Sequence, residues 1–559
     1  MTTTPVIVTS RERRMGAVQA VGRRPIDIER RWWESLLVFV LFTAAYAWFG
    51  YWLVVEKHVV GFETLDRLNR GLMIWHNEPP KLSAIGFDYP PLATLAVAPL
   101  ALFRGLASSL AIVPLASAVY GALTMVSLNT LMRRATIVAP LRAAVLVAVG
   151  LNPLVLLYAA NGARHFIWIS LLVVAIGALV AWFITADVRF VMISGLAFSL
   201  AALAGYSSLI WFAFAALMIG GILARLGADG TEVEGTVVGF ASPVVYVVAL
   251  WTAFNLLLLK DPFNWITQSS DSAGSGGLAD FTALEIARAT GELVLYSAPI
   301  AIVVLPALLF TGLSRSNPLA MWLGVLLLVA IAIPPAAFVL QLTDSPMNMR
   351  NGLPILLISV IGAIWLARSS AGGNGLVVAG LIVGLLASIP WTFNAMKTYE
   401  YQNLEAAFAN AVSTRQSQEG ARTIDGETIG IVSEQAMAEY VRSNIDDKNS
   451  ILTDNAQTYA VMLLTGRPEI FFDRVDKSDG PWQEAAKDPV NHVDYLLLST
   501  DGTDDLLTKL YPEAADGSDP LLPVVYRTER YVLVSVPTGF TRGADSLQQP
   551  PTASEGQQP

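Results

Sequence analysis

The sequence predicts a polytopic α-helical membrane protein, with about eleven membrane-spanning helices and a C-terminal α/β domain. Of its 559 residues 54% are hydrophobic and only 14% are charged, whereas about a quarter of a soluble globular chain is charged. Apolar runs of about 20 residues, the length that crosses a bilayer, recur through the first 395 residues. Beyond residue 400 the pattern changes to short, alternating helix and strand signals.

Composition excludes several classes of site. The chain has no cysteine, which rules out disulfides, thiolate metal sites and cysteine nucleophiles. Its four histidines are far apart and lack the spacing of a zinc hydrolase site. Residues 401–559 hold 12 Lys and Arg against 25 Asp and Glu. Because a nucleic-acid binder needs a basic surface, we expect no nucleic-acid partner.

The N-terminal segment 1–33 is expected to be a cytoplasmic tail, because seven arginines precede the first span. That span is too long for a signal peptide and no cleavage site follows it. An odd number of spans then puts the C-terminal domain on the extracytoplasmic side. The predicted spans are 34–55, 108–131, 141–160, 166–185, 189–205, 208–226, 237–257, 290–313, 318–340, 352–368 and 374–394.

Within a transmembrane domain at 34–396, two external loops stand out. The first, 56–107, includes a short apolar stretch at 90–104 that favours an interfacial helix over a crossing. The second, 258–289, is rich in Ser, Gly and Asp, and is expected to be a connector or a mobile lid. The acidic residues of this second loop, Asp261, Asp271 and Asp280, fit no compact metal loop. The sequence therefore assigns no metal ligands and leaves open whether a divalent cation takes part.

The C-terminal domain is expected at 397–540, followed by a polar, disordered tail at 541–559. Helices are predicted at AMAEYVRSNI, QTYAVMLLTG and DDLLTKLYP, and strands at SILTD, VDYLLLST and a terminal hairpin. Asp454 and Asn455 follow a strand, where site residues often lie in α/β sheets, although a helix cap is the simpler interpretation. No glycine-rich phosphate loop supports nucleotide binding.

The first external loop holds the densest polar cluster beside the membrane. If a helix begins near residue 62, Glu63, Arg67 and Arg70 share one face, and Asp66 lies three residues from Glu63. Such a carboxylate can accept a proton from a hydroxyl while an arginine holds a phosphate. Ordinary ion pairs of an interfacial helix are an equally good interpretation. Asp88, before a Pro-Pro turn, is either a second acidic site residue or a helix cap.

The order of these parts resembles the GT-C superfamily of membrane glycosyltransferases, which use polyprenyl-phosphate sugars. Closer still, the chain is similar over roughly residues 60–540 to an uncharacterised bacterial and archaeal GT-C-like group. The matching segments are ETLDRLNRG, PKLSAIGFDYPPL, NPLVLLYAANG, DPFNWITQSS, MRNGLPIL and ILTDNAQTYAVMLLTGRPEIFF. The resemblance implies a GT-C-like bundle with an outer α/β domain.

The resemblance also implies roles for individual residues. The group's first loop usually reads Asp-Ala-Leu-Ser-Arg, which puts its carboxylate at Glu63 and its arginine at Arg67. Arg350 matches an arginine of the group and is expected to hold a lipid phosphate. Asn152-Pro153 and Asn161-Gly162 also match the group's pattern.

Two positions depart from the group. An acidic residue commonly follows the Asn-Gly pair, but here Ala163, Arg164 and His165 follow it. The group's Arg-Tyr-Glu stands here as Gly205, Tyr206 and Ser207. His165 is either a replacement base or, more commonly for such a position, an interfacial residue. Arg164 pairs with Glu63 or a lipid phosphate, or it extends to headgroups, which is the expectation.

The leading functional hypothesis is an inverting glycosyltransferase of the plasma membrane. It would move a hexosyl or pentosyl group from a polyprenyl-phosphate donor to a cell-envelope glycan or lipid. In this hypothesis the catalytic residues are Glu63 or Asp66, as the base that takes the acceptor proton, and Asp88, as a second acidic site residue. Arg67 and Arg350 bind the donor phosphate, and Arg164, His165 and Tyr206 are auxiliary residues.

The alternative is a non-catalytic protein of the same fold, a scaffold or a lipid-sugar-binding protein in envelope assembly, which the altered positions favour. A transporter is less well supported, since no matched pair of broken helices appears in two halves. Arginine (28) outnumbers lysine (8), which is typical of a GC-rich bacterium.

Overall fold

The computed structural model describes residues 31–86, 90–266, 282–340, 347–370, 373–402, 404–419, 430–474, 480–500 and 505–538. The chain forms two compact units, and its first loop is shared between them. The bundle unit comprises Met1–Arg67, Ile85–Pro99 and Leu110–Gly430, and the α/β unit comprises Leu68–Ala84, Leu100–Ser109 and Ile431–Pro559. The expected domain border lies at 396/397, whereas the bundle unit extends to Gly430.

The bundle unit consists of helices. Its N-terminal helices are α2 (Trp32–Tyr51), continued by the π-helix η1 (Trp52–Glu56), then α3 (Phe62–His76), η2 (Leu82–Ile85), α4 (Leu92–Ala101) and α6 (Ile112–Arg134). Of these, α3, η2 and α4 cross the border between the units, and the short helix α5 (Arg104–Ser108) lies wholly in the α/β unit. Next come α7 (Ala139–Gly150), α8 (Pro153–Tyr158), α9 (Arg164–Thr185), α10 (Arg189–Ala204), α11 (Ser208–Arg225) and α12 (Gly230–Leu259). The last are α14 (Ala283–Ser297), α15 (Ala301–Ser314), α16 (Pro318–Val339), η4 (Met349–Gly352), α17 (Leu353–Ser369), α18 (Asn374–Ala395) and α19 (Glu405–Thr414).

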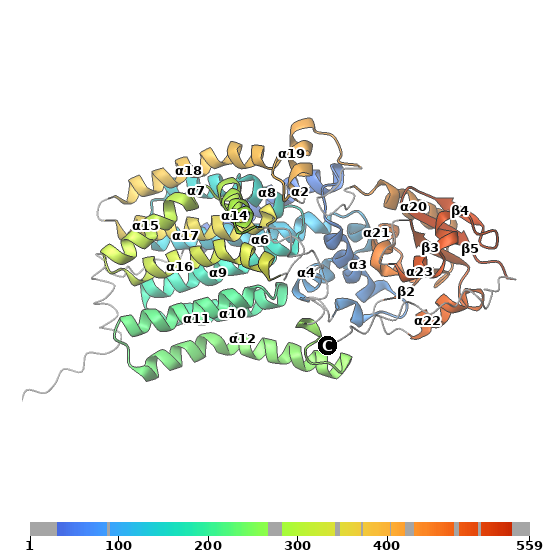
Figure 1. Ribbon diagram of the computed structural model, residues 1–559, viewed down its shortest axis with the longest axis horizontal. Helices are drawn as coiled ribbons and strands as arrows, with labels where there is room; N and C mark the ends of the chain where they lie inside the picture. The colour runs from blue at the N-terminus through green and yellow to red at the C-terminus, as the bar shows by residue number, and fades with distance from the viewer. Residues whose placement is uncertain are drawn as a thin grey trace, which may run out of the picture. The chain divides into compact units, whose positions relative to one another are not determined.

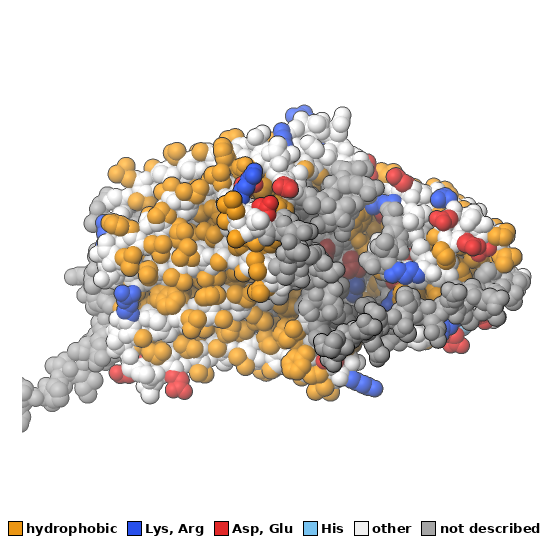
Figure 2. All heavy atoms as spheres, in the orientation of Figure 1, with side chains coloured by type: hydrophobic (Ala, Val, Ile, Leu, Met, Phe, Trp, Pro, Cys, Tyr) orange, Lys and Arg blue, Asp and Glu red, His pale blue; other side chains and the backbone are white. Residues whose placement is uncertain are grey.

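Long apolar helices make this unit a multi-pass membrane domain. In the described part of the chain, eight helices are long and apolar enough to cross a membrane. Helix α2 packs on α6, α9 lies between α6 and α10, and α15, α16, α17 and α18 pack on one another in sequence (Figure 1). Figure 2 shows hydrophobic side chains covering the visible face of these helices. Because lipid tails accept apolar side chains and hydrogen-bonded backbone alone, this surface suits the hydrocarbon core.

Three predicted spans are not single long helices. The segment 141–160 is divided into α7 and α8 at Asn152 and Pro153, because Asn152 has a non-helical backbone and its side chain caps α8. The segment 189–205 forms the shorter helix α10 of 16 residues. The segment 290–313 is α14 and α15, bent by 98° at the break that contains Pro299. Counted as one, this bent pair would make a ninth crossing.

A buried polar cluster closes one end of the bundle, where α2 and α7 begin and α6 ends. Glu34 accepts a hydrogen bond from Asn129 at 3.0 Å and pairs with Arg142. Arg142 also donates to Asn129 at 3.1 Å and to the Ile137 carbonyl at 2.9 Å. These bonds satisfy the charges away from water. We call this the Arg142 end of the bundle.

The α/β unit contains a five-stranded sheet, which confirms the predicted C-terminal sheet domain. Its strand order is β2-β1-β3-β5-β4, with β1 parallel to β2 and β3, and β5 antiparallel to β3 and β4. The strands are β1 (Ile451–Thr453), β2 (Phe471–Asp473), β3 (Tyr495–Ser499), β4 (Val524–Arg527) and β5 (Tyr531–Ser535). The helices are α20 (Val432–Asn444), α21 (Asn455–Thr465), η5 (Pro468–Ile470), α22 (Gly480–Lys487), η6 (Pro489–Asn491), α23 (Leu506–Leu510) and α24 (Pro512–Asp516).

Two pieces of the first loop are bound into the α/β unit by polar contacts. Asp473, at the end of β2, is buried and accepts from Asn77 at 2.7 Å and from Lys81 at 2.8 Å. Arg104 pairs with Glu469 at 2.7 Å. The α/β unit is therefore built from segments that are more than 300 residues apart in the chain.

Candidate functional site

The carboxylate of Glu63 lies in the first turn of α3, at the end of the bundle opposite to the Arg142 end. Helical geometry brings Arg67 one turn further on, and its Nη2 donates to Glu63 Oε1 at 3.0 Å. Arg67 is buried, whereas the Glu63 side chain is 42% exposed. The carboxylate is therefore accessible while the arginine behind it is held in place.

A second arginine reaches Glu63 from the start of α9. Arg164 forms an ion pair with Glu63, and not the expected extension to the lipid headgroups. The turn before it is fixed by Asn161, whose Oδ1 accepts from the Ala163 backbone at 3.1 Å. Gly162 adopts a φ of +79°, and a Cβ there would come within 2.7 Å of the Thr64 side chain on α3. The Asn-Gly pair thus allows the close approach that brings Arg164 to Glu63.

A third arginine, Arg350, lies within electrostatic range of Glu63 and belongs to η4. The backbone N–H of Met349 donates to the Tyr401 carbonyl at 3.2 Å, which ties η4 to the segment after α18. At the other end of η4, a Cβ on Gly352 would lie 1.8 Å from the Ser297 hydroxyl of α14. Arg350 is thus carried by a short helix that is held on both sides.

These cations set the ionisation of Glu63. Burial raises the pKa of its carboxyl, but the charges of Arg164, Arg67, His165 and Arg350 lower it more, so the net shift is well below the usual range. Glu63 is therefore ionised at neutral pH and held by arginines. A carboxylate in this state is a weak base until some other anion engages its partners.

A second carboxylate was not foreseen from the sequence. Glu405, the first residue of α19, is fully buried and accepts a hydrogen bond from the Tyr158 hydroxyl at 2.7 Å. Tyr158 also lies within the electrostatic range of Arg350. The only signal in the sequence is one acidic residue before an apolar helical stretch, LEAAFANAV.

The remaining sequence-predicted residues lie as follows. Asp66 is half-buried on α3, next to Arg67, and His165 is half-buried beside Arg164. Tyr206 belongs to an aromatic group, where it accepts from the Trp251 indole at 2.9 Å and lies against Trp265. Asp88 lies outside the described residues, as do Asp271 and Asp280, whereas Asp261 accepts from the Phe263 backbone at 2.9 Å.

No group of three His, Asp or Glu side chains that could hold a metal ion is found in the described ranges. The Glu63 cluster instead combines one carboxylate with three arginines, so it carries an excess of positive charge. Arginines recognise phosphate oxygens through planar, paired donors. The arrangement is suited to binding an anion, with a carboxylate directly beside it.

A helical bundle whose first loop and C-terminal segment together build an α/β unit supports the GT-C-like fold that the sequence resemblance implies. The chain is similar to the crystal structure of ArnT from Cupriavidus metallidurans bound to undecaprenyl phosphate, with a TM-score of 0.51 and 16% identity, over 89% of this chain and 97% of that one. The apo structure of the same ArnT matches with a TM-score of 0.51 and 13% identity, over 89% and 98%. No protein-family model and no curated protein matches the chain.

Proposed function

We propose that the chain is an inverting membrane glycosyltransferase that transfers a sugar from a polyprenyl-phosphate donor to an envelope glycan or lipid. The single observation that carries this proposal is the Glu63 carboxylate, held by Arg67 and Arg164 and within electrostatic range of Arg350. The GT-C fold supports it, because a solved structure of that fold is bound to undecaprenyl phosphate.

The proposed reaction begins with an exchange of partners. The donor phosphate takes the arginines that Glu63 holds in the resting site, which returns basicity to the carboxylate. Glu63 then accepts the proton of the acceptor hydroxyl as its oxygen attacks the anomeric carbon. The bond from that carbon to the phosphate oxygen breaks, polyprenyl phosphate leaves with its negative charge on the arginines, and the anomeric centre is inverted.

We further propose that the Glu63 end of the bundle and the α/β unit face the extracytoplasmic side of a bacterial plasma membrane. The motive is the run of arginines before the first span, which favours a cytoplasmic N-terminus. A cysteine introduced at Glu439 on α20 is expected to react with an impermeant reagent in intact cells. If the cysteine is labelled only after the cells are broken, the α/β unit lies on the cytoplasmic side instead.

The experiment that tests the activity is transfer of labelled sugar from membrane lipid pools by the purified chain. Glu63→Gln keeps the size of the side chain but removes its basicity, so we expect a loss of about a hundredfold or more in rate. Arg350→Ala is expected to raise the KM for the donor, since it removes a phosphate partner. Glu439→Gln, which breaks an exposed ion pair on α20, is the matched control and leaves transfer unchanged. If Asp66→Asn abolishes transfer and Glu63→Gln does not, Asp66 is the base.

A second candidate function is a non-catalytic lipid-sugar-binding protein of the same fold. It is favoured by the ion pairs that hold Glu63 in the resting site, and by Arg164 standing near the position where the resembling group has an acid. In this case the wild-type chain transfers no sugar from any polyprenyl-phosphate donor, yet binds one, and Arg67→Ala weakens that binding.

A further inference from the structure

A separate cavity opens inside the bundle, away from the Glu63 cluster. It lies between α15, α17 and α18 and has a volume of about 690 Å³, within the range of sites that hold small molecules. Its walls are mainly apolar, and lining residues such as Val303 and Phe310 are also exposed on the outer surface of the helices. The cavity is therefore open to the hydrocarbon region of a bilayer.

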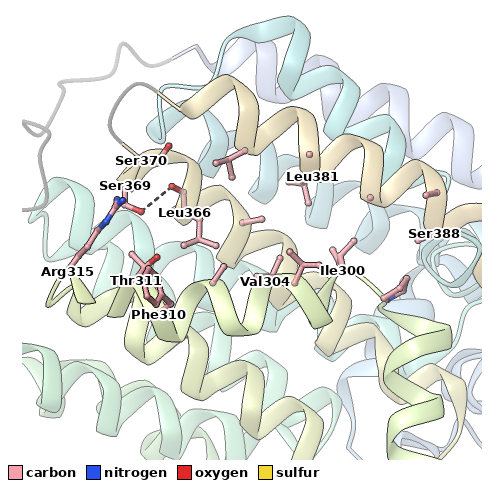
Figure 3. A pocket seen from close by; sticks show the side chains of 18 of the residues that line it. Ile300, Val304, Phe310, Thr311, Arg315, Leu366, Ser369, Ser370, Leu381 and Ser388 are labelled. Carbon is pink, nitrogen blue, oxygen red and sulfur yellow. Dashed lines mark hydrogen bonds between the residues drawn. The ribbon is translucent and has the colours of Figure 1, made fainter. Parts of the chain in front are cut away.

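One end of this cavity is polar. Among the described residues that line it, Arg315 carries the only charge, and Thr311, Ser369 and Ser370 add hydroxyls. Figure 3 shows the Arg315 side chain extending towards Ser369 and Ser370, while Ile300 and Ser388 lie at the far end. A single cation above an apolar slot matches a molecule with one anionic head and a long hydrocarbon chain.

The polar end lies at the membrane surface opposite to the Glu63 cluster. Arg350 precedes α17 and Ser369 ends it, so the helix of 17 residues separates the two by about 25 Å. Arg368, beside Ser369, donates to the Arg134 carbonyl at 3.0 Å, which fixes this end of α17 at the Arg142 end of the bundle. A head at Arg315 therefore belongs to the other leaflet from a ligand at Glu63.

We propose that this cavity binds an anionic glycerophospholipid of the leaflet at the Arg142 end. One acyl chain fills the slot between α15, α17 and α18, and the head phosphate lies on Arg315. Basic pockets between membrane helices bind anionic lipid heads in this way. Arg315 lines the polar end of this apolar slot, so a phosphate bound there can keep its acyl chain inside the slot.

The test uses the full chain in nanodiscs that contain a phospholipid with a photoreactive acyl chain, followed by mapping of the adducts. We expect adducts on peptides of α15 and α18 with phosphatidylglycerol. On the wild-type chain, phosphatidylcholine at equal dose should give about fivefold fewer adducts. Arg315→Gln should reduce the adducts with phosphatidylglycerol by the same factor, because one cation is worth about that much for binding an anionic lipid. Arg225→Gln changes an exposed arginine in the last turn of α11, at the Arg142 end of the bundle, and should leave the adducts unchanged.

Filling the cavity gives a second, independent readout. A Cβ on Gly380 meets no atom within 4 Å, so Gly380→Phe can occupy the slot without a backbone clash. It should abolish the adducts, whereas Gly375→Phe, at an equally open glycine outside the lining, should retain them. The proposal would be overturned if both lipids gave equal numbers of adducts, or if the two glycine variants had equal effects. It would also be overturned if polyprenyl phosphate displaced the phospholipid. The comparison of lipids on the wild-type chain decides it even if Gly380→Phe does not fold.

Discussion

Asp505 should make the α/β unit less stable as the pH rises from about 4 to about 6. This residue caps α23, and its Oδ1 accepts from the Leu507 and Thr508 backbones at 2.8 and 3.0 Å. Its Oδ2 is buried without a hydrogen-bond partner in the described part of the chain. Burial, helped by the nearby charge of Asp454 and opposed by the backbone hydrogen bonds, raises the pKa of this carboxyl to about 6.

The magnitude follows from the size of that shift. Below the unfolded pKa of 3.8 the carboxyl is protonated in both states, so it does not favour unfolding. Between 3.8 and about 6 the unfolded chain ionises freely while the folded unit resists, and stability falls. A difference of about two pKa units corresponds to a loss of about 3 kcal/mol, which persists at higher pH.

Hydrogen exchange of the β3 and β5 amides in the full chain measures this loss as an opening free energy. Asp505→Asn keeps the capping oxygen without the charge. At about pH 8 it should open less readily than wild type by up to about 3 kcal/mol, and at about pH 4 the two should be nearly equal. The exposed Asp494→Asn is the control. A difference between wild type and Asp505→Asn that is the same at both pH values would refute the reasoning.

Three further changes test the packing of the two units. Glu34→Ala leaves the buried Arg142 without its carboxylate partner, so the bundle should lose about 3 kcal/mol of stability. This loss would appear as a lower midpoint of thermal unfolding in detergent, and an unchanged midpoint would contradict the role of this cluster. Asp473→Ala should cost the α/β unit about 2 kcal/mol, because it removes the carboxylate that accepts from Asn77 and Lys81. The 68–84 segment is then held less firmly, and limited proteolysis should cut it first. The side chain of Gly352→Val cannot fit against α14, so this change should displace η4 and weaken the donor binding that depends on Arg350. Unaltered donor affinity would show that η4 can shift without weakening the site.

Local signals in the sequence predicted the local features of the site. The helical spacing that put Glu63 and Arg67 on one face is present in α3, because an i, i+4 pair depends on helix geometry alone. Apolar runs likewise predicted most of the long helices. The ion pair between Arg164 and Glu63 was only one of several alternatives at the level of the sequence, because it depends on how α9 packs against α3.

Long-range features could not be read in the same way. Glu405 lies 247 residues from its partner Tyr158, and no spacing rule connects them. Strand β2, of three residues after a 3₁₀ turn, was not predicted, although β1 of the same length was. The breaks in α7–α8 and α14–α15 fall at Pro153 and Pro299, but apolar flanks hid them within longer predicted spans.

The composite origin of the α/β unit has a consequence during synthesis. Its first pieces, 68–84 and 100–109, leave the ribosome more than 300 residues before the strands that complete it. Asn77 and Lys81 must wait through the insertion of almost all the membrane helices before Asp473 becomes available to them. Such late, non-local closure is slow and leaves polar and apolar surface unpaired in the meantime. A fragment that begins at residue 431 lacks these pieces, so it should fold poorly unless the first loop is supplied with it.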